Sequence, residues 1–164
     1  MSKEKLLLVG AGGFGRMVAE QASRQYDCAF VDDGQVVGAE VCGIPVVGGI
    51  ADLPELRKEY ALLTVGIGNN KFRAQVFEKA EALGFAFPNI IAPSAYISPY
   101  AKIGYGCVVL QNACIQNGSQ VGNGVFCTPV VLAVRTVWKR AASNLTLVSG
   151  SMSRWASTTI TSCK

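Results

Sequence analysis

The sequence has no histidine, and its six cysteines, at positions 28, 42, 107, 114, 127 and 163, include no Cys-x-x-Cys pair. Histidine and closely spaced cysteines supply most zinc ligands in proteins, so a zinc site is not expected. We therefore predict that no metal is bound and that the thiols are reduced, as is usual in a reducing compartment.

Long apolar runs are also absent. The stretch Leu6–Val9 is too short for the core of a signal peptide, and it leads directly into glycines. No run approaches the roughly 18 residues that a membrane helix needs. The sequence therefore predicts a cytoplasmic protein without a membrane segment.

Acidic residues are missing from the second half of the chain, because the last of the eleven is Glu81. The formal net charge of +4 therefore comes from the part that follows Glu81. The basic residues form no cluster of the kind that binds nucleic acid, whereas a phosphorylated ligand is compatible with this charge. We expect no nucleic-acid partner.

The 164 residues allow one ordinary domain or two small ones. Near the start, the apolar run Lys5–Val9 is followed by Gly10-Ala-Gly-Gly-Phe-Gly15 and then by helical spacing to Arg24. Strand, glycine loop and helix in this order are typical of a phosphate-binding unit. Gly10 turns the backbone out of the strand, Gly12 and Gly13 let a phosphate approach main-chain N–H groups, and Gly15 lets the helix lie close. The alternative is a glycine turn that only packs.

Two further strands are predicted to end beside this loop. Cys28–Val31 ends in Asp32 and Asp33, whose carboxylates can accept hydrogen bonds from ribose hydroxyls or a base edge. Ala61–Val65 ends in Gly66-Ile-Gly-Asn-Asn70, and a helix follows to Leu83. In this segment Asn69 and Asn70 either bind a sugar or phosphate or form a turn and helix cap. About 85 residues supply little more than half of a dinucleotide fold, so a single nucleotide is favoured over NAD.

From Ile91 to Phe126 the sequence repeats every six residues. Each of the six hexads opens with a branched aliphatic and has a small residue or valine four places later. This period is typical of short strands that wind around a triangular prism. We predict an α/β Rossmann-like domain (1–88), a left-handed parallel β-helix of about two coils (89–126), and an atypical tail (127–164).

The hexads stop after Phe126. Residues 127–164 contain one glycine and no Asp, Glu or His, whereas the preceding 36 residues contain five glycines. One interpretation is a tail produced by a reading-frame error, which replaces further coils. The other is a cap over the open end of the prism, because solenoids need such segments.

Five features of the sequence occur together: the glycine loop at 10–15, Asp32-Asp33, Ile44-Pro-Val-Val-Gly48, Gly66–Asn70 and the hexads from Ile91. This combination resembles the bacterial sugar O- and N-acetyltransferases, a family that includes the sialic acid O-acetyltransferases and the UDP-4-amino-sugar N-acetyltransferases. The resemblance implies a role in glycan biosynthesis. It implies a nucleotide-sugar acceptor in the first domain, acetyl-CoA along the prism, and a homotrimer. The acceptor site that it implies consists of Gly10, Gly12, Gly13, Phe14, Gly15, Asp32, Asp33, Gly68, Asn69 and Asn70.

The family places its catalytic base, a histidine, one coil beyond these hexads, whereas this chain has none, so we predict no catalytic residue here. Phe14 also stands where many relatives have histidine. Two alternatives remain open. One is an NAD(P)-binding protein, and the other is a non-catalytic module that trimerises through its prism.

Overall fold

The computed structural model describes residues 3–128 and 137–138. Most of the tail, and with it both interpretations of residues 127–164, lies outside the described residues. In the described part of the chain, no helix is both long and apolar enough to span a membrane.

The N-terminal unit is built on one five-stranded sheet with the order β3-β4-β2-β1-β5. Its four parallel strands are β1 (Glu4–Val9), β2 (Tyr26–Val31), β4 (Ile44–Gly48) and β5 (Leu62–Val65). The short strand β3 (Glu40–Val41) pairs antiparallel with β4 at one edge. The Rossmann-like arrangement predicted from the sequence is therefore present, with an added edge strand.

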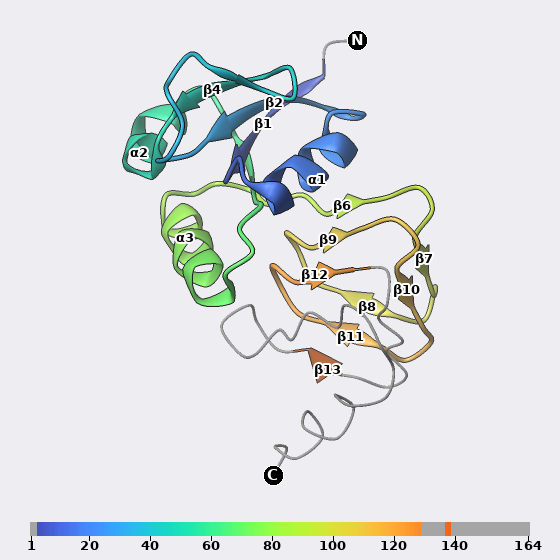
Figure 1. Cartoon of the computed structure of the whole chain (residues 1–164). Helices are drawn as coiled ribbons and strands as arrows, with labels where there is room; N and C mark the ends of the chain where they lie inside the picture. Colours follow the sequence, from blue (N-terminus) through green and yellow to red (C-terminus); the bar gives the residue numbers. More distant parts are fainter. Residues whose placement is uncertain (1–2, 129–136, 139–164) are drawn as a thin grey trace.

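Helices cover both faces of this sheet (Figure 1). The helix α1 (Gly13–Ala22) packs on the face that carries Leu6, Leu8 and Phe30. The helices α2 (Leu53–Leu56) and α3 (Asn70–Ala82) pack on the face that carries Leu7 and Val9. A single turn of 3₁₀ helix, η1 (Ile50–Asp52), leads into α2. Neighbouring residues of β1 are thus buried on opposite faces, which explains why its last four residues, Leu6–Val9, are all apolar.

The second unit is a coil of two-residue strands. These are β6 (Ile90–Ile91), β7 (Tyr96–Ile97), β8 (Lys102–Ile103), β9 (Val108–Val109), β10 (Cys114–Ile115), β11 (Gln120–Val121) and β12 (Phe126–Cys127). Each pairs in parallel with the strand eighteen residues away, for example Val108 with Ile90 and with Phe126. The pairs form three separate sheets, and β13 (Val137–Trp138) pairs with β11. Three hexads therefore make one turn of the coil.

The interior of the coil holds the aliphatic residues that open the hexads. Val109, Ile115 and Val121 are buried there together with the small residues Cys107 and Ala113. Ile91 also opens a hexad, but this residue is 37% exposed. It belongs to the first coil, so a neighbouring coil covers it on one side only.

A second apolar stripe, which the sequence analysis did not identify, joins the two units. It consists of Ile90, Val108 and Phe126, which lie eighteen residues apart. Each directly precedes or closes a hexad, and all three face outward on one sheet of the coil. All three are at most 5% exposed, because they pack in the same cluster as Phe14 and Val18 of α1. Figure 1 shows α1 lying against this side of the coil. The apolar character repeats at every third hexad, which is the signal that could have predicted the contact.

Candidate functional site

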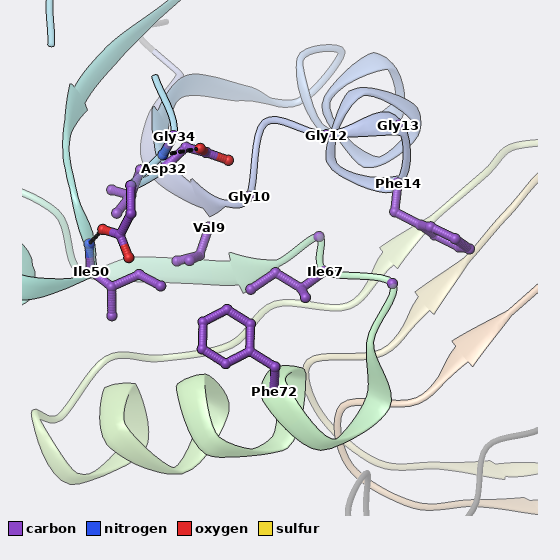
Figure 2. A pocket seen from close by; sticks show the side chains of 14 residues that line it. Val9, Gly10, Gly12, Gly13, Phe14, Asp32, Gly34, Ile50, Ile67 and Phe72 are labelled. Atoms are coloured by element: carbon purple, nitrogen blue, oxygen red, sulfur yellow. Dashed lines mark hydrogen bonds between the residues drawn. The ribbon is translucent and has the colours of Figure 1, made fainter. Parts of the chain in front are cut away.

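A cavity of about 350 Å³ opens where β1, β2 and β5 end. Parallel sheets of this kind bind ligands at the carboxyl ends of their strands. Of the residues predicted from the sequence, Gly10, Gly12, Gly13, Phe14, Asp32, Asp33 and Gly68 line the cavity. Gly15, Asn69 and Asn70 do not line it. Figure 2 shows the cavity between the glycine loop and α3.

The glycine loop has the geometry that its sequence predicted. Gly10 has a φ of +99°, which favours glycine, and its N–H donates to the carbonyl oxygen of Val31 at 2.8 Å. Gly12 and Gly13 have no neighbouring atom within 4 Å of where a Cβ would lie. A Cβ on Gly15 would lie 1.7 Å from the carbonyl oxygen of Gly10. The loop is therefore open toward the cavity and tightly closed behind it.

Both carboxylates after β2 hold main-chain amides. Asp32 Oδ2 accepts from the N–H of Ala11 at 2.6 Å, and Oδ1 accepts from the N–H of Gly34 at 2.8 Å. Asp33 Oδ1 accepts from the N–H of Ile50 at 2.8 Å. Asp32 thus fixes the glycine loop to the end of β2. It also lines the cavity, and each of its oxygens can accept a further hydrogen bond.

The segment after β5 forms the opposite wall. The N–H of Gly66 donates to the carbonyl oxygen of Val9 at 2.8 Å, and the side-chain oxygen of Asn69 caps α3 by accepting from the N–H of Phe72 at 2.9 Å. The cap was one of the two roles considered for Asn69, and it leaves the side-chain NH₂ group for other contacts. Asn70 lies inside the first turn of α3, where its Oδ1 accepts from Arg73.

Sequence reasoning missed the apolar walls of the cavity. Ile50, Ile67 and Phe72 line it, and Figure 2 shows the Phe72 ring extending from α3 toward Ile67 and the end of β1. Phe72 is 44% exposed, although it is a large apolar residue near the start of a helix. That position, next to a glycine-rich turn, was the available signal. Amide donors beside apolar walls suit a ligand that carries both a phosphate and a planar ring.

The coil lies directly beside the site. Figure 2 shows Phe14 leaving the glycine loop toward the coil strands. Its ring meets that of Phe126 edge to face, with ring centroids 5.9 Å apart. A Cβ on Gly68 would lie 2.9 Å from the Phe14 ring. The glycine loop, the Gly66–Asn70 segment and the coil therefore meet at Phe14.

Comparison with known proteins identifies this combination of units. Residues 5–80 match the PglD N-terminal domain family. The acetyltransferase domain of PglB from Neisseria gonorrhoeae FA1090, solved with acetyl coenzyme A, is 38% identical with a TM-score of 0.70, over 85% of this chain and 66% of that one. The chain belongs to the family of bacterial sugar N-acetyltransferases.

Two structures from Caulobacter crescentus extend this likeness to the acetyltransferase family. A histidine-to-asparagine variant of perosamine N-acetyltransferase, in complex with CoA and GDP-perosamine, is 29% identical with a TM-score of 0.71, over 84% of this chain and 66% of that one. PerB, with the same two ligands, is 31% identical with a TM-score of 0.69, over 82% and 62%. The chain thus spans just under two thirds of the length of these acetyltransferases.

An acetyltransferase needs a group that accepts the proton of the attacking nucleophile. Burial raises the pKa of the Cys107 thiol, and burial together with the nearby Cys107 raises the pKa of Cys127 to about 12. Both thiols lie inside the coil and stay protonated at neutral pH. Residues 3–128 also hold no cluster of three or more His, Cys, Asp or Glu side chains that could bind a metal ion.

The buried thiol of Cys127 should make the protein less stable in alkali. Its pKa is higher in the folded state, about 12, than its ordinary value of 9.0, so its contribution is complete below pH 9 and is lost as the pH rises toward 12. We expect the free energy of unfolding to fall by about 1.4 kcal/mol per pH unit more in the wild type than in Cys127→Ala. Urea unfolding at several pH values from 8 to 11 measures this. As a control, replacing the exposed Cys42 by serine should leave this slope unchanged. Equal slopes in the wild type and in Cys127→Ala would show that the Cys127 thiol does not cause the loss of stability.

Proposed function

We propose that this chain binds a nucleotide-linked amino sugar in the cavity and that acetyl-CoA, the donor, lies along the coil. The observation that carries this proposal is the contact between Phe14 and Phe126, because Phe14 lines the cavity and Phe126 belongs to the coil. The relatives support it, since they were solved with acetyl-CoA, CoA or GDP-perosamine. The acceptor would then reach the donor where the two units meet.

Each part of the cavity has a role in this proposal. The N–H groups of Gly12 and Gly13, at the start of α1, donate to phosphate. Asp32 and Asp33 accept from the ribose or the base, and the Phe72 ring offers a flat surface for the base. Gly68 and Asn69 complete the phosphate contacts from the other wall. A sheet with four parallel strands supplies one nucleotide site, which favours a nucleotide-sugar over NAD(P).

The finer features of the family are part of the same proposal. The coil is taken as a left-handed β-helix, and the protein is taken as a cytoplasmic homotrimer in polysaccharide biosynthesis. A pairing interval of eighteen residues supports the β-helix. Sedimentation equilibrium tests the trimer, because closed symmetric association would give three times the mass of 17.3 kDa.

Turnover is limited by the lack of a group that can accept the proton of the attacking amine. In acetyl transfer the acceptor amine attacks the thioester carbon, the carbon–sulfur bond breaks, and the proton leaving nitrogen ends on the sulfur of CoA. This sequence contains no imidazole to carry that proton, and the thiols inside the coil are themselves protonated. The chain should therefore bind its substrates and turn them over negligibly. We attribute the missing base to a frame-shifted tail after about residue 127, and translation of the coding DNA in the other frames should restore hexads and a histidine.

Calorimetry with UDP- and GDP-linked 4-amino sugars, combined with mass spectrometry of the sugar after incubation with acetyl-CoA, tests the function. We expect micromolar binding and no detectable acetylated product. Gly13→Leu is the matched control, because its side chain projects from an open position that lines the cavity, and binding should be lost. Rapid acetylation would disprove the missing base. Binding of NAD(H) without nucleotide-sugar binding would instead favour the NAD(P) alternative.

A further inference from the structure

Arg73 is an almost completely buried cation beside the candidate site. It lies in the first turns of α3 and is 3% exposed. Neither of the salt bridges found in the described part of the chain involves it. Burial lowers the pKa of its guanidinium. Burying a charge without an opposite charge is costly, so the contacts of this side chain must offset that cost.

Those contacts are main-chain and side-chain amide oxygens of residues 66–70, the wall segment that follows β5. Nη1 of Arg73 donates to the carbonyl oxygen of Ile67 at 2.8 Å and approaches that of Gly68 at 3.5 Å. Nη2 donates to Oδ1 of Asn70 at 2.9 Å, whereas Nε has no hydrogen-bond partner among the residues that the structure describes. The guanidinium carbon also lies 4.9 Å from the centroid of the Phe126 ring, on the coil. Arg73 therefore holds the wall segment on one side and contacts the coil on the other.

The fixed carbonyls determine where the neighbouring amides point. The peptide bonds are trans, so the N–H of a peptide unit points away from its C=O. Because the Ile67 carbonyl points at Arg73, the N–H of Gly68 points away from it, and the Gly68 carbonyl has the same effect on the N–H of Asn69. Neither N–H donates a hydrogen bond within residues 3–128. Gly68 itself lines the cavity, next to the Phe14 ring of the glycine loop. Asn69 does not line it, but its N–H belongs to the peptide unit that Gly68 begins.

We propose that Arg73 is a positioning residue, which turns the 67–68 and 68–69 peptide units so that their N–H groups bind the diphosphate of the nucleotide-sugar. This inference rests on the proposed function and deepens it. The diphosphate would be held from two sides, by the amides of Gly12 and Gly13 and by those of Gly68 and Asn69. Lysine cannot replace the arginine fully, because one ammonium group cannot fork between the Ile67 carbonyl and the Asn70 side chain.

The test compares diphosphates with nucleosides in Arg73→Met, Arg73→Lys and Lys71→Met. The last variant removes one charge from an exposed side chain of the same helix turn and serves as the control. For Arg73→Met we expect affinity for UDP or GDP to fall at least about tenfold, as for the loss of hydrogen bonds to a charged group. Affinity for uridine or guanosine should change less than about twofold, because nucleosides lack the phosphates. Arg73→Lys should lie between wild type and Arg73→Met, and Lys71→Met should match wild type.

Amide NMR shifts of Gly68 and Asn69 on addition of UDP or GDP give the direct readout. They should move in the wild type and stay fixed in Arg73→Met. Equal losses for diphosphates and nucleosides, or wild-type shifts in Arg73→Met, would overturn the proposal while leaving the proposed function intact. A wild type that binds neither diphosphate would remove the proposed function itself. If Arg73→Met does not fold, Arg73→Lys supplies the same comparison.

Discussion

Gly15→Ala is expected to lower the free energy of unfolding by at least about 3 kcal/mol, the upper range for overpacked sites. The added methyl group would lie 1.7 Å from the carbonyl oxygen of Gly10, and main-chain atoms cannot move aside as a flexible side chain can. A Cβ on Gly66 would in turn lie 2.5 Å from the Cα of Gly15. The start of α1 therefore packs backbone against backbone, and any side chain must separate α1 from the sheet.

Gly13→Ala is the matched control for this substitution. It lies two positions away in the same helix, and no atom lies within 4 Å of its added methyl group. Because alanine favours helices more than glycine does, the stability should be unchanged or rise by up to about 1 kcal/mol. Urea unfolding followed by circular dichroism measures both variants. Similar stabilities for the two would show that the close approach at Gly15 is not rigid.

Asp32→Asn should destabilise the protein by about 2 kcal/mol, as expected when a hydrogen bond to a charged group is lost. Both carboxylate oxygens of Asp32 accept from main-chain N–H groups, those of Ala11 and Gly34. An asparagine has only one acceptor oxygen, so its NH₂ group would face one of those donors. We also expect nucleotide affinity to fall, since the glycine loop would lose its link to the end of β2.

Asp33→Asn provides the comparison, because within the described part of the chain only one oxygen of Asp33 accepts a main-chain hydrogen bond, from the N–H of Ile50 at 2.8 Å. Asparagine keeps that acceptor, so stability should stay within about 0.5 kcal/mol of wild type. Thermal and urea unfolding of the two variants, measured side by side, separates the loss of a main-chain hydrogen bond from the loss of one negative charge. If both variants lose the same stability, net charge rather than the loop contact explains the effect.

Much of this architecture could be predicted because short-range patterns determine it. The left-handed Gly10, the close approach at Gly15 and the buried strand ahead of them follow from glycine spacing and an apolar run. The eighteen-residue pairing of the coil follows from the six-residue period. In both cases one local feature of the sequence corresponds to one local geometry.

The remaining features depend on contacts between distant segments. Nothing near Arg73 in the sequence indicates that it would be buried against Phe126, fifty-three positions later, and arginine is usually exposed. Likewise, Ile50 lines the cavity, and its N–H donates to Asp33, seventeen positions earlier. Such residues can be found only once distant segments of the chain are placed together.

The stripe of Ile90, Val108 and Phe126 also restricts how this protein can change in evolution. A residue inserted into one of the strands between 90 and 126 would shift every later position of the coil by one place. Phe126 would then turn away from Phe14. An insertion that keeps the cavity against the coil must therefore bulge out as a loop at a corner, where the eighteen-residue pairing on either side of it is preserved. Among the described residues, α1 covers the flank of the coil that β6, β9 and β12 form, and it leaves the other two sheets of the coil free of contact with this helix.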